Sequence, residues 1–421
     1  MIPRMRRPTL PEFRMNLRNA TRTALALCLL LMVAAVAIPN PQEKQYKDRA
    51  EYDLITKVYG EQNPASKIVL LDEWKEKYPE TDYNLERLQF YLDSYQKTSK
   101  TAEAVDVAKE LLAVVPGNFA ANYAITLFTP YLGRADDGTI GDGIKAANEL
   151  LGVIPTQFGT KPDTVAQDAW DNARSQAEVA AHLTIGWGQM QRKQNSEAEA
   201  SFNKVLQLDP SRGQVSYWQG QVILGQNDAE KYDVAFFHFA RAAIYDGPNA
   251  MAPEGRTQVL DYVQNMLKKN YGENSFNVYW PRFEEMAGAS ALPAERIELK
   301  SDQQLDFEAE QKSRKENPLL WTFKDLRKAL TGPQGGTTWG NLNGALSPKM
   351  RLYVVSATPP ERPGTINFSS EPGGSVEVVV NLENRRRTGV RSGTMLTFEG
   401  VAAGLRASPF RLTLNDGKIV P

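Results

Sequence analysis

The sequence predicts a mainly α-helical protein, with a solenoid of helical hairpins followed by a small all-β barrel or sandwich. Three observations indicate this fold class. Prolines recur after helix-like segments at intervals slightly above about 34 residues, apolar residues follow a helical period as far as residue 330, and beyond Pro348 that period shortens to two. The expected segments are a signal peptide (1–37), a solenoid (45–290), a charged segment with a short amphipathic helix and a glycine-rich linker (291–346), and a β domain (347–421).

The first 37 residues have the composition of an export signal. Basic residues from Arg4 to Arg22 precede an apolar run from Ala24 to Ile38, and Ala35-Val36-Ala37 supplies a cleavage sequence. A helix of about 15 residues spans ~22 Å, less than the ~30 Å apolar core of a bilayer. We therefore expect cleavage after Ala37 and a periplasmic or extracellular protein, with an uncleaved membrane anchor as the alternative. The translation start is left open among Met1, Met5 and Met15.

The composition argues against several classes of function. The 49 basic and 50 acidic residues leave a net charge of −1, which gives no bulk attraction to nucleic acid or to an anionic membrane. Two histidines and one cysteine are too few for most zinc, haem, disulfide or thiol sites. His182 and His238 lie on expected helices without a serine or aspartate pattern, so structural roles are expected. We predict no enzymatic activity, no cofactor and no metal.

The clearest repeat unit runs from Val179 to Arg212. Its signature positions carry small residues, large apolar residues and a final proline, namely Ile185, Gly186, Ala198, Phe202, Val205 and Pro210. This pattern resembles the tetratricopeptide repeat, although His182 and Gln189 stand where that family prefers aromatic residues. The resemblance implies that Gly186 and Ala198 let two helices approach closely and that Phe202 fills the groove between hairpins.

Other segments extend the helical array. A second unit with the same pattern covers 85–118, and a third begins at Gly213 and is lengthened by an insertion near residue 228. Further helices are expected in a weaker unit (51–79), on both sides of 134–143, over 163–193, and over 255–270 and 279–286. The acidic, glycine-rich stretch 134–143 predicts a solvated turn, because its carboxylates lack the alternation and closing Glu of a calcium loop.

The remaining residues predict a change of structure. A charged stretch, 303–315, precedes a short amphipathic helix over 319–330 that we expect to cap the solenoid, and 332–338 reads as a linker. Five short strands are then expected at 352–355, 365–368, 376–380, 395–398 and 410–414. The β domain resembles an oligonucleotide/oligosaccharide-binding barrel.

One loop of the β domain is strongly basic. It carries Arg385, Arg386, Arg387 and Arg391. Such a loop beside a barrel could hold nucleic acid or another polyanion. The other interpretation is an edge hairpin kept soluble and unpaired by charge. We favour this interpretation and expect no nucleic acid partner.

The repeat resemblance implies a concave surface that binds a protein or peptide. The first helices of the hairpins would line it, with the candidate residues Tyr91, Tyr95, His182, Gln189, Gln191, Tyr217 and Gln221. Tyr91 and Tyr95 also suit the core of a hairpin, which we favour for these two. The sequence thus predicts a non-enzymatic exported scaffold or adaptor, and the alternative is a polyanion-binding module centred on the β domain.

Overall fold

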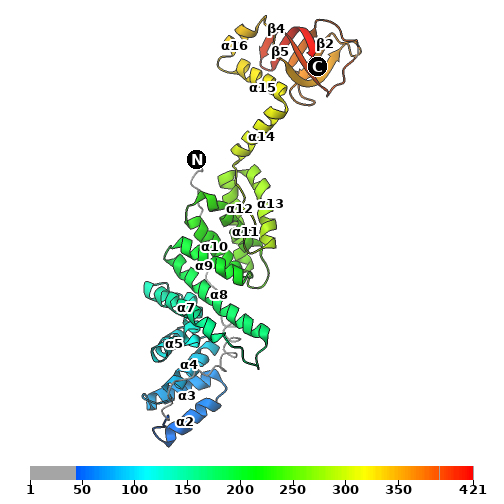
Figure 1. Ribbon diagram of the computed structural model, residues 1–421. Helices are drawn as coiled ribbons and strands as arrows, with labels where there is room; N and C mark the ends of the chain where they lie inside the picture. The colour runs from blue at the N-terminus through cyan, green and yellow to red at the C-terminus, as the bar shows by residue number, and fades with distance from the viewer. Residues whose placement is uncertain (1–43, 388, 421) are drawn as a thin grey trace. The chain divides into compact units, whose positions relative to one another are not determined.

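The computed structural model describes residues 44–387 and 389–420, so the predicted signal peptide lies outside the described residues. Contacts between Cα atoms divide the chain into two compact units that meet between Asp302 and Gln303. The first unit is helical, and the second contains helices and a five-stranded barrel (Figure 1). The predicted fold class is confirmed. Within the described ranges, no helix is both long and apolar enough to cross a membrane.

The first unit consists of stacked helical hairpins. In chain order its helices are α2 (Arg49–Gly60), α3 (Pro64–Lys77), α4 (Asn84–Lys97), α5 (Thr101–Val114), α6 (Phe119–Phe128), α7 (Asp137–Gln157), α8 (Gln167–Gln191), α9 (Asn195–Leu208), α10 (Gly213–Gly225), α11 (Tyr232–Ile244), α12 (Pro253–Tyr271) and α13 (Glu273–Ala289). Each even-numbered helix from α2 to α12 is the first helix of a hairpin. Two short 3₁₀ helices, η1 (Thr129–Tyr131) and η2 (Ala229–Lys231), lie in turns, and η2 is the expected insertion.

The repeat register predicted from the sequence is confirmed. A Cβ atom added to Gly186 would lie 2.7 Å from Cε1 of Phe202, and one added to Gly220 would lie 3.0 Å from the ring of Phe239. Ala198 and Phe202 have no exposed surface. Small residues at these places therefore let neighbouring helices touch, and the phenylalanines fill the space between them.

The turn expected at 134–143 is wrong beyond Asp136. Helix α7 begins at Asp137, because the Asp136 carboxylate caps it by accepting a hydrogen bond of 2.9 Å from the Thr139 backbone N–H. Gly143 lies inside this helix, where a Cβ atom would come within 2.6 Å of Thr129 Cγ2. Glycine at position 143 therefore allows α7 to pack closely against Thr129, and it does not form a turn.

The second unit begins with three helices, α14 (Asp302–Glu316), α15 (Pro318–Thr331) and α16 (Gly335–Leu342). Two expectations are wrong here. Residues from Gly335 form a helix instead of a linker, and the apolar face of α15, which we expected to form a cap on the solenoid, is used to pack on the barrel. Phe323 and Leu330 of α15 are buried in the barrel's apolar core, and Trp339 of α16 packs against it.

The barrel contains β1 (Met350–Thr358), β2 (Thr365–Ser369), β3 (Val378–Leu382), β4 (Met395–Ala407) and β5 (Phe410–Val420). Its strands close in the order β1-β2-β3-β5-β4, and among these five strands β3 and β5 form the parallel pair. Alternate residues point inward, so Ile366 and Phe368 of β2 and Val378 and Val380 of β3 are fully buried. The sequence predicted all five strands but not their order.

Candidate protein-binding site

A pocket opens between the first helices of three successive hairpins. It is a small hollow with a cavity volume of about 20 Å³, which is room for about one water molecule. Helix α6 and the adjoining η1 contribute Leu127 and Tyr131, helix α8 contributes Gln176 and Leu183, and Arg212 enters from the turn before α10. The pocket thus combines apolar walls with a few polar groups.

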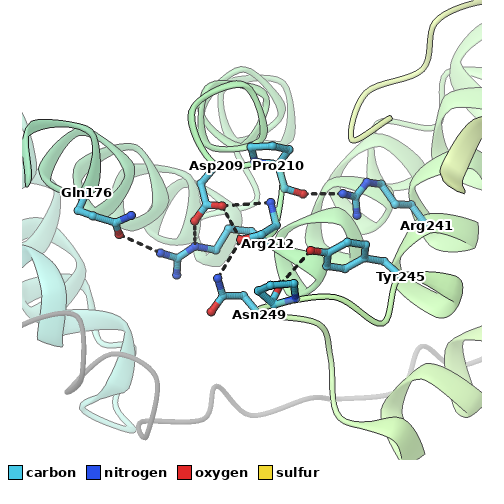
Figure 2. Close-up of polar contacts among 9 residues, drawn as sticks. Gln176, Asp209, Pro210, Arg212, Arg241, Tyr245 and Asn249 are labelled. Carbon is cyan, nitrogen blue, oxygen red and sulfur yellow. Dashed lines mark hydrogen bonds and ion pairs between the residues drawn. The ribbon is translucent and has the colours of Figure 1, made fainter. Parts of the chain in front are cut away.

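The turn between α9 and α10 fixes Arg212. Its Nε donates a hydrogen bond of 2.6 Å to Oδ2 of Asp209, and its Nη2 donates one of 3.4 Å to Oε1 of Gln176 (Figure 2). The Ser211 backbone N–H donates to the other Asp209 oxygen at 3.0 Å, and Asn249 donates to the Ser211 hydroxyl at 2.8 Å. The guanidinium group is therefore held at the pocket wall by partners on both sides.

A second polar group of the pocket is the phenol of Tyr131. Burial raises its pKa, while the nearby positive charge of Arg212 opposes this rise, so the phenol stays protonated at neutral pH. The hydroxyl makes no hydrogen bond to a described residue. Thr184 also lines the pocket, but its hydroxyl already donates to the Thr126 carbonyl at 2.7 Å. Tyr131 is thus a free donor and Thr184 is not.

An aromatic surface lies on, and just before, the first helices of the two N-terminal hairpins. It consists of Tyr46, Tyr52, Tyr59, Tyr83 and Phe90, of which Tyr59 is 54% exposed. The Tyr46 and Tyr83 rings stack at 4.8 Å, and the Tyr59 and Phe90 rings meet edge to face at 4.9 Å. Neither this surface nor the pocket was predicted from the sequence, although the seven-residue spacings from Tyr52 to Tyr59 and from Tyr83 to Phe90 signal a shared helix face.

The structure places the predicted tyrosines away from the pocket. Tyr91 is 3% exposed, and its hydroxyl donates to Oδ1 of Asp72 at 2.8 Å. Tyr95 is half-buried and stacks on Tyr91 at 5.5 Å, so both belong to a hairpin core, as the favoured interpretation held. Tyr217 is 1% exposed, and its hydroxyl accepts a hydrogen bond of 3.0 Å from Gln221. The prediction that Tyr217 faces a partner is therefore wrong, because it faces the core.

The three candidates on α8 do not line the pocket either. His182 is half-buried, and burial lowers its pKa. Gln189 accepts a hydrogen bond of 2.8 Å from the Ser201 hydroxyl of its own hairpin, whereas Gln191 is exposed. Of the seven candidate residues, only Gln191 thus has an exposed side chain.

The other histidine is a core residue. His238 has no exposed surface, and neither ring nitrogen has a hydrogen-bond partner among the described residues. Burial, with a smaller contribution from Arg241, lowers its pKa to about 3. Within the residues that the structure covers, no three His, Cys, Asp or Glu side chains gather to hold a metal ion.

The basic loop joins β3 to β4. Arg385, Arg387 and Arg391 are exposed and Arg386 is half-buried, and none of the four forms an ion pair with a described residue. The structure therefore leaves these charges accessible to solvent.

Neither a family model nor a curated protein matches this sequence. Solved structures are similar at low identity. They include a double mutant of MamA (RS-1 ArsTM; 14% identity, 51% of this chain, 93% of that chain, TM-score 0.31). A thermophilic tetratricopeptide-repeat protein from Thermus thermophilus is 13% identical over 51% of this chain and 98% of its own (TM-score 0.28). A tetratricopeptide-repeat protein from Parabacteroides merdae is 13% identical over 57% of this chain and all of its own (TM-score 0.28).

Proposed function

We propose that the helical unit binds a segment of a partner protein along the first helices of its hairpins. The observation that carries this proposal is the pocket bounded by α6, α8 and the start of α10, with Arg212 fixed at its wall. The aromatic surface lies on the same row of helices, at α2 and α4. Helical repeats present such rows as extended binding surfaces, because each hairpin contacts only its neighbours.

A bulky residue at the pocket rim tests this function. Gln176→Trp fills the rim with an indole ring, and we expect it to abolish capture of the physiological partner by the full chain. Gln167→Trp places the same ring on an exposed position of α8, outside the pocket, and should leave capture intact. Equal capture by both variants would show that the partner binds elsewhere.

We also propose that the protein acts outside the cytoplasm as a non-enzymatic scaffold or adaptor. The support is the order of basic residues, apolar run and Ala35-Val36-Ala37 in the sequence. N-terminal sequencing of the native protein should give a chain that starts near Ile38. An intact Met1 on a cytosolic product would contradict export, and an intact leader in the membrane fraction would favour the anchored alternative.

The second candidate function is polyanion binding by the barrel. One observation favours it, namely the four arginines of the β3–β4 loop, which form no ion pair with described residues. A closed five-stranded barrel is also the architecture that the sequence resemblance implied. We rank this function below protein binding, since the outward-facing side chains of β2 and β3 include no aromatic ring on which bases could stack.

A further inference from the structure

We propose that the aromatic surface at the N-terminal end of the helical unit rests on the interfacial layer of a lipid bilayer. This inference goes beyond the partner binding proposed above, because it assigns a separate ligand to α2 and α4. Three features of this end of the molecule support it, namely the exposed rings, the charges around them, and the place where the chain enters the unit.

Exposed aromatic rings gather on the first hairpin of the array. Tyr46 is 41% exposed and Tyr52 38%, and Tyr59 is more exposed than either. Contiguous exposed apolar surface on a soluble protein usually marks a contact with a protein or a membrane. Tyrosine has an apolar ring and a polar hydroxyl, and it is enriched where a bilayer meets water. These rings therefore suit a layer that is apolar on one side and wet on the other.

Cationic side chains frame the same rings. The guanidinium carbon of Arg49 lies 4.7 Å from the centre of the Tyr52 ring, and Nζ of Lys67 lies 5.1 Å from the centre of the Phe90 ring. Long basic side chains cover apolar surface with their methylene groups and keep the charge in a polar layer. At a bilayer this arrangement places the charges at the level of the lipid phosphates and the rings below them.

The rings, and not the charge of the unit, must provide the attraction. Acidic side chains outnumber basic ones between Lys44 and Asp302, so the helical unit gains no net attraction from an anionic membrane. We therefore expect contact with zwitterionic phosphatidylcholine as well as with anionic phosphatidylglycerol. Binding through the arginine loop of the barrel would instead require anionic lipid.

The chain enters the helical unit beside these tyrosines. The Gln45 backbone N–H donates a hydrogen bond of 2.9 Å to Oδ2 of Asp82, which fixes the entering segment on the start of α4. The apolar run of the sequence ends at Ile38, and the chain from there to Lys44 can span at most ~20 Å. A bilayer that held this run would lie within that distance of Lys44. The rings do not depend on this tether, so we expect the contact with or without residues 1–37.

Hydroxyl-radical footprinting of the full chain tests the contact. Phosphatidylcholine vesicles are added, and the oxidation of single side chains is read by mass spectrometry. Oxidation of Tyr52 and Tyr59 should slow by about threefold or more, while Phe307, an exposed ring of α14, should react as before. Replacing about a third of the lipid with phosphatidylglycerol should alter this protection by less than about twofold.

Variants locate the contact. Tyr52→Ser combined with Tyr59→Ser removes two rings, after which vesicles should no longer slow the oxidation of Tyr46. Tyr59→Trp keeps a ring and supplies a reporter, so vesicles of brominated phosphatidylcholine should quench the emission that this indole adds. Phe307→Trp is the matched control, and its added emission should stay unquenched. Because Tyr59 and Phe307 are both exposed, neither tryptophan disturbs a core.

The outcomes separate this inference from its rivals. Unchanged oxidation of Tyr52 and Tyr59, or equal protection of Phe307, would show that the aromatic surface is not a membrane contact. Protection that required phosphatidylglycerol would assign the contact to the basic loop of the barrel. Loss of partner capture in Tyr59→Ser, without any protection by vesicles, would show that a protein covers the rings. The proposed function is tested separately by Gln176→Trp, which leaves the aromatic surface unaltered.

Discussion

In the helical unit, apolar side chains join helices that follow one another in the chain, whereas in the barrel they join strands far apart in the sequence. The apolar core of the helical unit is divided into three successive clusters, spanning α2 to α7, α6 to α8 and α8 to α13. The barrel has one cluster, and its closure pairs Met350 of β1 with Phe398 of β4.

This difference has energetic consequences. In a repeat array, stability is approximately a sum over hairpins and their interfaces, so damage stays near its origin. In a small closed barrel, each strand is paired on both edges only when all five strands are in place. Damage to one strand should therefore destabilise all of them. The comparison predicts which helices or strands a mutation should destabilise, as well as how large the loss of stability should be.

The largest effects should come from cavities in the two cores. Phe202→Ala between hairpins and Phe398→Ala in the barrel should each cost about 3–5 kcal/mol, because both side chains are fully buried. Hydrogen exchange in the full chain should then show lost protection across all five strands for Phe398→Ala. For Phe202→Ala the loss should concentrate in α8 to α11 and spare α2 to α5. Uniform loss throughout the helical unit would contradict the additive description.

Overpacking should have a smaller effect. Ala198→Leu adds three carbon atoms where two helices touch and should cost about 1–3 kcal/mol in denaturant melts of the full chain. Ala200→Leu makes the same change at an exposed position of α9 and should cost less than about 0.5 kcal/mol. Equal melting of the two variants would mean that the repeat register is misassigned.

Acid should weaken the helical unit more than the barrel, because both histidines lie in the helical unit. The pKa of His238 is about 3 in the folded state, against about 6.5 when unfolded. The unfolded chain therefore binds the extra proton, and stability falls as pH drops below 6.5. Between pH 7 and 5.5 the loss should be about 1 kcal/mol.

A substitution isolates this histidine. His238→Gln should flatten the pH slope of the unfolding free energy, whatever its effect at pH 7. His182→Gln should leave most of the slope, since His182 is only half-buried. An unchanged slope in His238→Gln would indicate that other groups dominate in this pH range.

The smallest effect is expected from the basic loop. Replacing Arg385, Arg386, Arg387 and Arg391 with Ser should change partner binding by less than about twofold, because charges at a rim mainly affect association rate. If the barrel is the binding module, binding should instead vanish, and the parent's affinity should fall steeply with salt. A binding assay at two ionic strengths distinguishes these outcomes.

Most of the helical unit could be predicted because its constraints recur in the sequence. Gly186 and Ala198 occupy positions where only a small residue fits, and Phe202 occupies one that needs a large residue. The same pattern returns in the next hairpins. The strands were recognisable from alternation alone. The parallel pairing of β3 with β5 was not, because it joins residues such as Val378 and Leu412 that no local pattern connects.

Neither the pocket nor α16 was predicted from the sequence, and the two reasons differ. The pocket groups Tyr131, Gln176 and Arg212, which lie on three separate elements and share no spacing. Helix α16 begins with Gly335 and Gly336, which are poor helix formers, so local propensity favoured a linker. Its Trp339 packs against the barrel core, and this tertiary contact outweighs the propensity.

The exposure of helix α14 affects where a protease can cut the chain. None of its residues between Asp302 and Glu316 is buried, and Lys312 and Lys315 are not covered by other elements. Because its helical form has few tertiary contacts, it should unwind more readily than the helices before and after it. Trypsin should therefore cut the native protein first in α14, which would make this helix the natural place to divide the gene into separately expressible halves.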